Sequence, residues 1–268
     1  MVGSHPFRSV SREFHGNRRT VLNILEIAGQ KAAAFLDAKI RNVKATQIQA
    51  DELASYVRCR QHLAKGDDTR GAFYTFLSVA RESKLIVNFK TDKHTKLVSL
   101  DFLNDLKSRM AERFQLSTDG WAGFCGSTGS VRQVFGDSID YATEIKRYFR
   151  ESPKLNTRTY QLARFNCLRV ASVRKTPRIG LPDMRLATTS HCERTNLTMR
   201  HFTKRFHRLT LGYSKTLENH RHAVALFVFY FNCVRRHGTL GKTPAETAGI
   251  LEKPMSIADL LNWNENQP

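Results

Sequence analysis

Cysteine is scarce in this sequence, and the spacing of the few that occur excludes two classes of cross-linked protein. The 268 residues include five cysteines, none arranged as a C-x-x-C pair. Zinc ribbons need such pairs, and small disulfide scaffolds need a dense, even set. We therefore expect a reduced protein that is held together by a hydrophobic core.

Long apolar segments are also missing. The longest apolar run, from Ala223 to Val234, is about 12 residues, whereas a membrane-spanning helix needs about 20. The first residues lack the apolar core of a secretory signal peptide. These absences predict a soluble, cytoplasmic protein with no membrane partner.

Acidic residues are few relative to basic ones. Lysine and arginine number 43 against 24 acids, which gives a formal charge of +19 and a pI of about 10.1. The apolar fraction of 41% is that of a globular protein, and the length predicts one large domain with a small one. A folded domain with this charge repels itself unless it binds a polyanion, so nucleic acid is the expected partner.

The N-terminal region, residues 1–45, has the pattern of a helix-turn-helix followed by a linker. Two short helices are predicted on either side of Gly16-Asn17, the second ending at Gly29, and residues 31–45 are predicted as a helical linker. A basic second helix is typical of a DNA-reading element. Arg18 and Arg19 are therefore expected to contact DNA, with plain solvated charges as the alternative.

The next segment changes to strand patterns. Three runs, 45–53, 71–79 and 85–89, predict an antiparallel meander, and residues 97–114 have helical spacing. Residues 115–121 predict a further strand that ends at Asp119. Three strands, a helix and a fourth strand ending in an acid follow the order of the RNase H-like fold. We therefore predict an α/β protein with a mixed sheet flanked by helices, in a catalytic domain spanning residues 46–245.

Two acids would meet in that fold, because its first and fourth strands lie side by side. Asp51 and Asp119 would then repel, and each would raise the pKa of the other unless a cation lies between them. A pair of Mg²⁺ ions about 3.5–4 Å apart needs such a shared ligand and a further carboxylate. Glu193 could supply it. Asp51, Asp119 and Glu193 are thus the predicted catalytic residues and metal ligands.

Glu193 lies in a predicted helix from Ser190 to Arg208. One face would carry Glu193, Asn196, Arg200, Lys204 and His207, and the other Met199, Phe202, Phe206 and Leu209. Such a face is either a charge-compensated surface or a metal-binding carboxylate among groups that hold phosphates. On the second interpretation, the expected DNA-binding residues are Arg194, Arg200, Lys204, Arg205 and Arg208.

The remaining segments complete the prediction. Residues 139–149 are expected to be helical, and 150–185 an irregular basic insertion that contacts DNA or is a solvated connector. Residues 217–236 predict a buried helix, and 246–268 form a C-terminal tail.

Several ordered motifs resemble the DDE-type insertion-sequence transposases of bacteria. They comprise Asp51-Glu52-Leu53, Thr118-Asp119-Gly120, Glu193-Arg194 with Asn196 and Arg200, Ser214-Lys215 with Leu217 to His220, Tyr230-Phe231-Asn232 with Arg235 and His237, and Thr243-Pro244-Ala245. The resemblance covers nearly all of residues 7–265. Two positions depart from it, since Ala54 replaces a usual Trp and Phe227 a common His.

The resemblance implies an RNase H-like, integrase-core domain with Asp51, Asp119 and Glu193 as the catalytic triad and a two-metal site for Mg²⁺ or Mn²⁺. It further implies DNA cleavage and strand transfer on double-stranded DNA, both the ends of the element and its target, by a homo-oligomer in the bacterial cytoplasm near the nucleoid. The alternatives are a catalytically inactive DNA-binding regulator or decayed copy, and a structure-selective nuclease.

Overall fold

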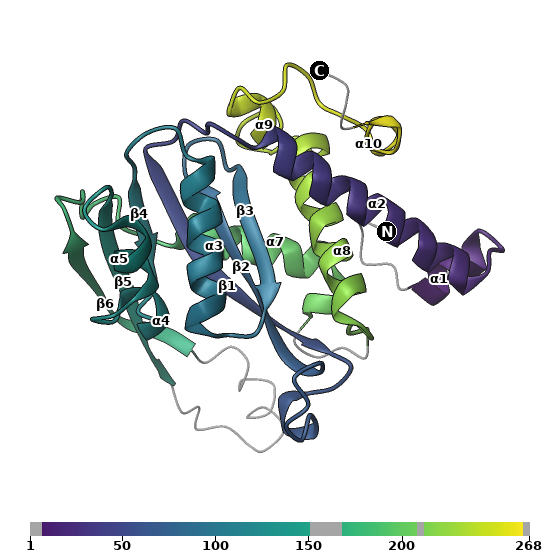
Figure 1. Cartoon of the computed structure of the whole chain (residues 1–268), viewed down its shortest axis with the longest axis horizontal. Helices are drawn as coiled ribbons and strands as arrows, with labels where there is room; N and C mark the ends of the chain where they lie inside the picture. Colours follow the sequence, from purple (N-terminus) through teal and green to yellow (C-terminus); the bar gives the residue numbers. More distant parts are fainter. Residues whose placement is uncertain (1–6, 151–167, 208–211, 265–268) are drawn as a thin grey trace.

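The core of the protein is a six-stranded mixed sheet. A computed structural model describes residues 7–150, 168–207 and 212–264. Its strands lie in the order β3-β2-β1-β4-β5-β6, and helices cover both faces (Figure 1). The pairs β1–β4 and β4–β5 are parallel, and the others are antiparallel. The predicted α/β class with a mixed sheet flanked by helices is confirmed.

The first three strands form the predicted meander. They are β1 (Gln47–Val57), β2 (Gly71–Ala80) and β3 (Ile86–Asp92), and both hairpin pairs are antiparallel. Strand β1 continues beyond the end of the predicted run 45–53. Pairing with β2 continues as far as Val57↔Gly71, so Asp51 and Glu52 lie in the middle of β1.

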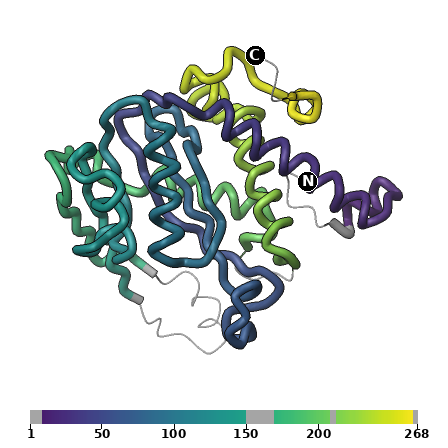
Figure 2. Tube along the Cα trace, viewed as in Figure 1, coloured from purple at the N-terminus to yellow at the C-terminus, as the bar shows by residue number. Residues whose placement is uncertain are grey.

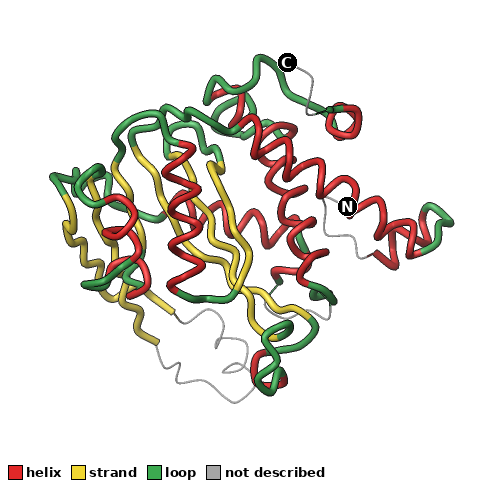
Figure 3. Tube along the Cα trace, viewed as in Figure 1, coloured by secondary structure: helices red, strands yellow, loops and turns green. Residues whose placement is uncertain are grey.

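Helices pack on the two faces of this sheet (Figures 1 and 3). On one face, α3 (Lys96–Arg109) lies with α4 (Ala122–Cys125) and α5 (Ser130–Phe135). On the other, α7 (Ser190–Phe202) packs against β1 and β2, while α8 (Leu217–Phe229) carries α2 (Arg18–Lys39) on its outer side. β4 (Gln115–Thr118) follows α3 and pairs with β1, as the predicted strand order requires.

The N-terminal region differs from the expected pair of short helices and linker. After α1 (Phe7–Glu13), a single 22-residue helix, α2, runs straight through Gly29. A Cβ at this glycine would lie 2.4 Å from Cβ of His222, so glycine permits α2 and α8 to approach closely. Packing, rather than a helix end, explains this glycine. Figure 2 traces the α1 end of α2 projecting beyond the sheet.

The prediction of a helix after α5 is wrong. Residues 139–149, predicted to be helical, form strand β5 (Asp140–Arg150), and part of the expected irregular insertion is strand β6 (Leu168–Ile179). Aromatic and β-branched residues such as Tyr141 and Thr143 favour the extended backbone, and pairing with β4 decides in its favour. The rest of that insertion, residues 151–167, lies outside the described residues.

The helix that carries Glu193 is shorter than predicted. It ends at Phe202, because the β-branched Thr203 takes an extended backbone conformation, and a short 3-10 turn (Lys204–Phe206) follows. Arg208 lies outside the described residues. Downstream, α8 and the π-helical turn Tyr230–Val234 form the predicted buried helix. Two short capped helices, α9 (Pro244–Thr247) and α10 (Ile257–Asn262), lie in or next to the predicted tail 246–268. The predicted domain boundary at residue 245 falls within α9.

In the part of the chain that the structure describes, every helix is too short or too polar to cross a lipid bilayer.

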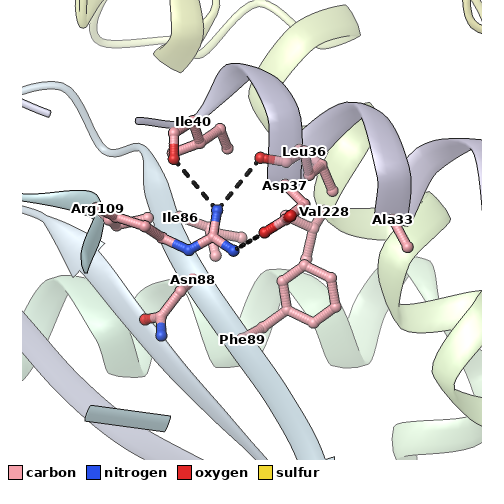
Figure 4. A pocket seen from close by; sticks show the side chains of 10 residues that line it. Ala33, Leu36, Asp37, Ile40, Ile86, Asn88, Phe89, Arg109 and Val228 are labelled. Atoms are coloured by element: carbon pink, nitrogen blue, oxygen red, sulfur yellow. Dashed lines mark hydrogen bonds and ion pairs between the residues drawn. The ribbon is translucent and has the colours of Figure 1, made fainter. Parts of the chain in front are cut away.

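A buried arginine at the end of α3 joins this helix to the end of α2 (Figure 4). Arg109, at the end of α3, donates to the carbonyl oxygens of Leu36 and Ile40 at 3.3 and 3.2 Å. Leu36 lies in the last turn of α2, and its carbonyl also accepts the N–H of Ile40, the residue that caps the helix. The Ile40 carbonyl lies just beyond the helix, where the regular helical hydrogen bonds end. The same guanidinium bonds Asp37 at 2.6 Å and Asp105 at 2.9 Å, beside a cavity of about 180 Å³. Arg109 thus fixes α2 against α3.

We expect Arg109→Ala to lower the free energy of unfolding by about 2–4 kcal/mol, since buried carbonyls lose their donor. Arg41→Ala is the matched control, because Arg41 bonds the same Asp37 at 2.6 Å from an exposed position. That control should cost less than about 1 kcal/mol. Urea unfolding measures both, and equal losses would contradict the role of Arg109.

Candidate metal centre

Two parallel strands bring the predicted aspartates together. The last residues that pair between β1 and β4 are Gln49 and Ser117. In each of these two segments an aspartate, Asp51 or Asp119, follows two residues later. Ligand oxygens of Asp51, Asp119 and a third acid, Glu52, all lie within 4.8 Å of one another. This acidic centre lies at the middle of the sheet, between the α3 side and the α7 side.

Glu52 is not among the predicted metal ligands, for a physical reason. Neighbouring residues in a strand point to opposite faces, so Asp51 and Glu52 would not be expected to share a site. Asp51 does face α7, where Asn196 donates to its Oδ2 at 2.8 Å. Glu52 faces the α3 side, yet its carboxylate still reaches the others. The sequence shows that Asp51 and Glu52 are neighbours, but it does not show that the longer Glu52 side chain can bring its carboxylate to the other two.

Each carboxylate in the centre has one oxygen held by a neighbouring group. Besides the bond from Asn196 to Asp51, the backbone N–H of Trp121 donates to Oδ1 of Asp119 at 2.9 Å. Nε2 of His94 lies 2.8 Å from Oε1 of Glu52. These three contacts come from α7, the β4–α4 connection and the β3–α3 connection. Elements on both faces of the sheet therefore orient the acids.

His94 is itself fixed by an aromatic stack. Its ring lies between Tyr74, at a centroid distance of 4.3 Å, and Trp121, at 4.0 Å, with both pairs nearly parallel. Since Trp121 also bonds Asp119, the stack connects two of the three acids. A histidine held in this way has little freedom to rotate, so it positions Glu52.

Asp51 and Glu52 hold their protons more tightly than an ordinary carboxyl group does. Burial, together with the charge of Asp119, raises the pKa of Asp51 to about 6 and that of Glu52 to about 8. Burial lowers the pKa of His94. Without a cation, the raised pKa of Glu52 and the lowered pKa of His94 both favour the uncharged forms of this pair near neutral pH.

The donor set fits a hard divalent cation. Oε2 of Glu52 is buried and has no hydrogen-bond partner within the described residues. A buried carboxylate oxygen in that state is costly unless a cation satisfies it. Oxygen ligands from carboxylates are those that Mg²⁺ and Mn²⁺ prefer. Asp51, Glu52 and Asp119 could thus hold such an ion.

Glu193 lies near the acidic centre but outside the tight group. It is in the first turn of α7, and its negative charge contributes to the raised pKa of Asp51. Its own carboxylate is 46% exposed and bonds Nζ of Lys146 at 2.6 Å and the hydroxyl of Thr189 at 2.9 Å. For Glu193 to bind an ion as well, Lys146 would have to give up this contact.

The predicted DNA-binding cations lie in three places. Arg194 is exposed beside Glu193, and Arg200 lies in the last turn of α7. Lys204 follows in the 3-10 turn, while Arg18 and Arg19 are exposed at the start of α2, away from the acidic centre (Figure 1).

Arg205 takes part in an interior network. It donates to the hydroxyl of Ser214 at 2.7 Å, and burial lowers its pKa to about 10. Ser214 in turn bonds His220, whose other ring nitrogen lies 3.1 Å from the hydroxyl of Ser55 on β1. Burial lowers the pKa of His220 to about 3, so the ring is neutral. This network fastens the far end of β1 to α8.

No protein-family model matches the chain, and no curated protein matches it. Its function therefore has to be inferred from its own residues.

The raised pKa values predict how stability depends on pH in the absence of metal. As pH rises from about 4 to about 8, the unfolded state releases the Asp51 and Glu52 protons before the folded state does, so these groups destabilise the fold progressively. Glu52→Gln should remove most of this penalty. At pH 8.5 in EDTA we expect the variant to exceed wild type by roughly 2–4 kcal/mol, with a smaller difference at pH 5.

Thermal or urea unfolding at the two pH values provides the measurement. Glu112→Gln serves as the control, because Glu112 is exposed and lies outside the acidic centre. Equal stability of wild type and Glu52→Gln at pH 8.5 would mean that the carboxylates do not repel one another as described.

Proposed function

We propose that this protein is a DDE-type transposase that cleaves and transfers DNA strands with the help of divalent metal ions. The observation that carries the proposal is the cluster of Asp51, Glu52 and Asp119 at the centre of the sheet. Glu193 lies near this cluster, in the first turn of α7. The strand order β3-β2-β1-β4-β5 supports an RNase H-like fold, and the charge of +19 supports a nucleic-acid substrate.

Each side chain has a defined part in this proposal. Asp51 and Asp119 would act as metal ligands, and Asn196 and the Trp121 N–H keep those carboxylates oriented. His94 holds one oxygen of Glu52, while the buried Oε2 has no hydrogen-bond partner within the described residues and could bind a cation. Bound Mg²⁺ or Mn²⁺ would supply a water of lowered pKa and neutralise charge at the phosphodiester. Arg194 and Arg200 would bind phosphates beside the centre.

The contact between Lys146 and Glu193 favours a second candidate function. A lysine that neutralises the third acid of the triad would leave a DNA-binding protein that lacks cleavage activity and acts as a regulator. The two functions make different demands on Glu193. A transposase needs this carboxylate for catalysis, while a regulator needs it only as a partner of Lys146.

We expect Asp119→Asn to reduce metal-dependent cleavage and joining at least about a hundredfold, because the ligand shared by the cations is lost. The substrate is a duplex carrying the ends that flank this coding sequence, with Mg²⁺ or Mn²⁺. Asp137→Asn, an exposed acid outside the centre, should cleave like wild type. Undiminished cleavage by Asp119→Asn would refute the proposed centre.

Glu193→Gln belongs in the same assay. A transposase should lose cleavage in this variant while its DNA affinity is retained. Binding by wild type and all variants, with cleavage by none of them, would support the regulator instead.

A further inference from the structure

Beyond the sheet, strands β5 and β6 continue as a two-stranded ribbon. Pairing of β5 with β4 ends at Thr143, so the later residues of β5 have only β6 as a neighbour. We call residues 146–149 and 169–174 the distal ribbon. Its exposed side chains lie on both faces of the strand pair, in contrast to the buried residues 141–144. The distal ribbon is therefore accessible to a partner.

The distal ribbon, together with residues 175–178 that follow it in β6, has an excess of basic residues and no acidic residue of its own. Residues 146–149 and 169–178 contain no carboxylate and six cations, namely Lys146, Arg147, Arg169, Arg174, Lys175 and Arg178. The cations nearer the sheet are engaged: Lys146 bonds Glu193, Lys175 bonds a carbonyl at 3.2 Å, and Arg178 bonds Thr143 at 3.3 Å. Arg147 and Arg174 are exposed and, among the described residues, have neither a hydrogen-bond nor an ion-pair partner.

The two exposed arginines share one face of the ribbon. Arg147 pairs with Ser172, and Arg174 pairs with Ile145. The arginines are therefore diagonal neighbours on adjacent strands, with backbones about 7–8 Å apart across the strand pair. Phe149, 46% exposed, is two residues further along β5 on the same face. Lys146 is on the opposite face, which is the face that meets Glu193. We call the face with Arg147 and Arg174 the arginine face.

We infer that the arginine face of the distal ribbon binds the phosphodiester backbone of DNA. The inference deepens the proposed function and depends on it for the choice of DNA as ligand. Guanidinium groups pair with phosphate through two parallel hydrogen bonds, and two unpaired arginines on a rigid strand pair retain that capacity. Strands rise about 3.3 Å per residue, so Arg147 lies only one step beyond the residue that contacts Glu193. DNA held there would lie against the face of the ribbon opposite Glu193, next to the strand position that contacts this acid.

A simpler role for these cations is protection of the sheet edge. β6 is an edge strand, and charged residues on such strands prevent pairing with another chain. That role predicts self-association of an uncharged variant with no change in its affinity for DNA. The two roles are therefore separable by experiment.

The test compares a double variant, Arg147→Gln with Arg174→Gln, with a control that loses the same charge. The control carries Lys242→Gln and Lys253→Gln, two exposed lysines in the C-terminal region. Fluorescence anisotropy with a labelled duplex and a single strand of the same length is recorded in EDTA over a range of salt concentrations. Unchanged thermal melting establishes that both proteins are folded.

We expect the ribbon variant to bind DNA about tenfold more weakly near 0.1 M salt. The slope of log K against log salt should fall by about 2, since each lost phosphate contact removes about 0.9. The control should keep the wild-type slope. A larger loss on the single strand would identify unpaired DNA as the ligand, with Phe149 available for base stacking.

Wild-type affinity and slope in the ribbon variant, on both forms of DNA, would overturn the inference, as would self-association with unchanged affinity. This assay requires no cleavage. If no protein cleaves DNA but the ribbon variant still binds weakly, the proposed transposase function fails while the DNA-binding surface stands.

Discussion

Repulsion among three buried carboxylates is the constraint on which the rest of this structure depends. Asp51, Glu52 and Asp119 place ligand oxygens within 4.8 Å of one another in a largely buried site, where burial and the charge of Asp119 raise the pKa values of Asp51 and Glu52. A fold that served stability alone would avoid this arrangement. The acids remain together because the strands, the stacked histidine and Asn196 hold them, at a cost in stability that bound cations would offset.

The support around the acids comes from widely separated parts of the chain. Asn196 reaches Asp51 from α7, and His94 reaches Glu52 from the connection before α3. Further along β1, Ser55 and His220 join the strand to α8, and Arg109 joins α3 to α2. Each of these contacts uses a buried polar group that is costly to leave unpaired. The same contacts that complete the core therefore fix the position of the acids.

Sequence patterns predicted the order of the strands that frame the site, although they did not predict where β1 ends. The meander, the helix before β4 and the adjacency of Asp51 and Asp119 all followed from periodicity and strand order. Two features could not be predicted from local patterns. Glu52 joins the site through side-chain reach, which strand alternation hides. Lys146 contacts Glu193 from strand β5, in a segment that the sequence predicts to be helical.

Trp121 offers a direct probe of the proposed binding of a divalent cation at the acidic centre. The chain has two tryptophans, and a Trp263→Phe variant leaves only Trp121, which stacks on His94 and bonds Asp119. Titration with Mn²⁺, a paramagnetic quencher, should reduce its fluorescence to a saturable plateau. Excess Mg²⁺ should restore the emission, and Asp51→Asn should abolish the effect. An emission that Mn²⁺ leaves unchanged, or quenches equally in the Asp51→Asn variant, would contradict the account.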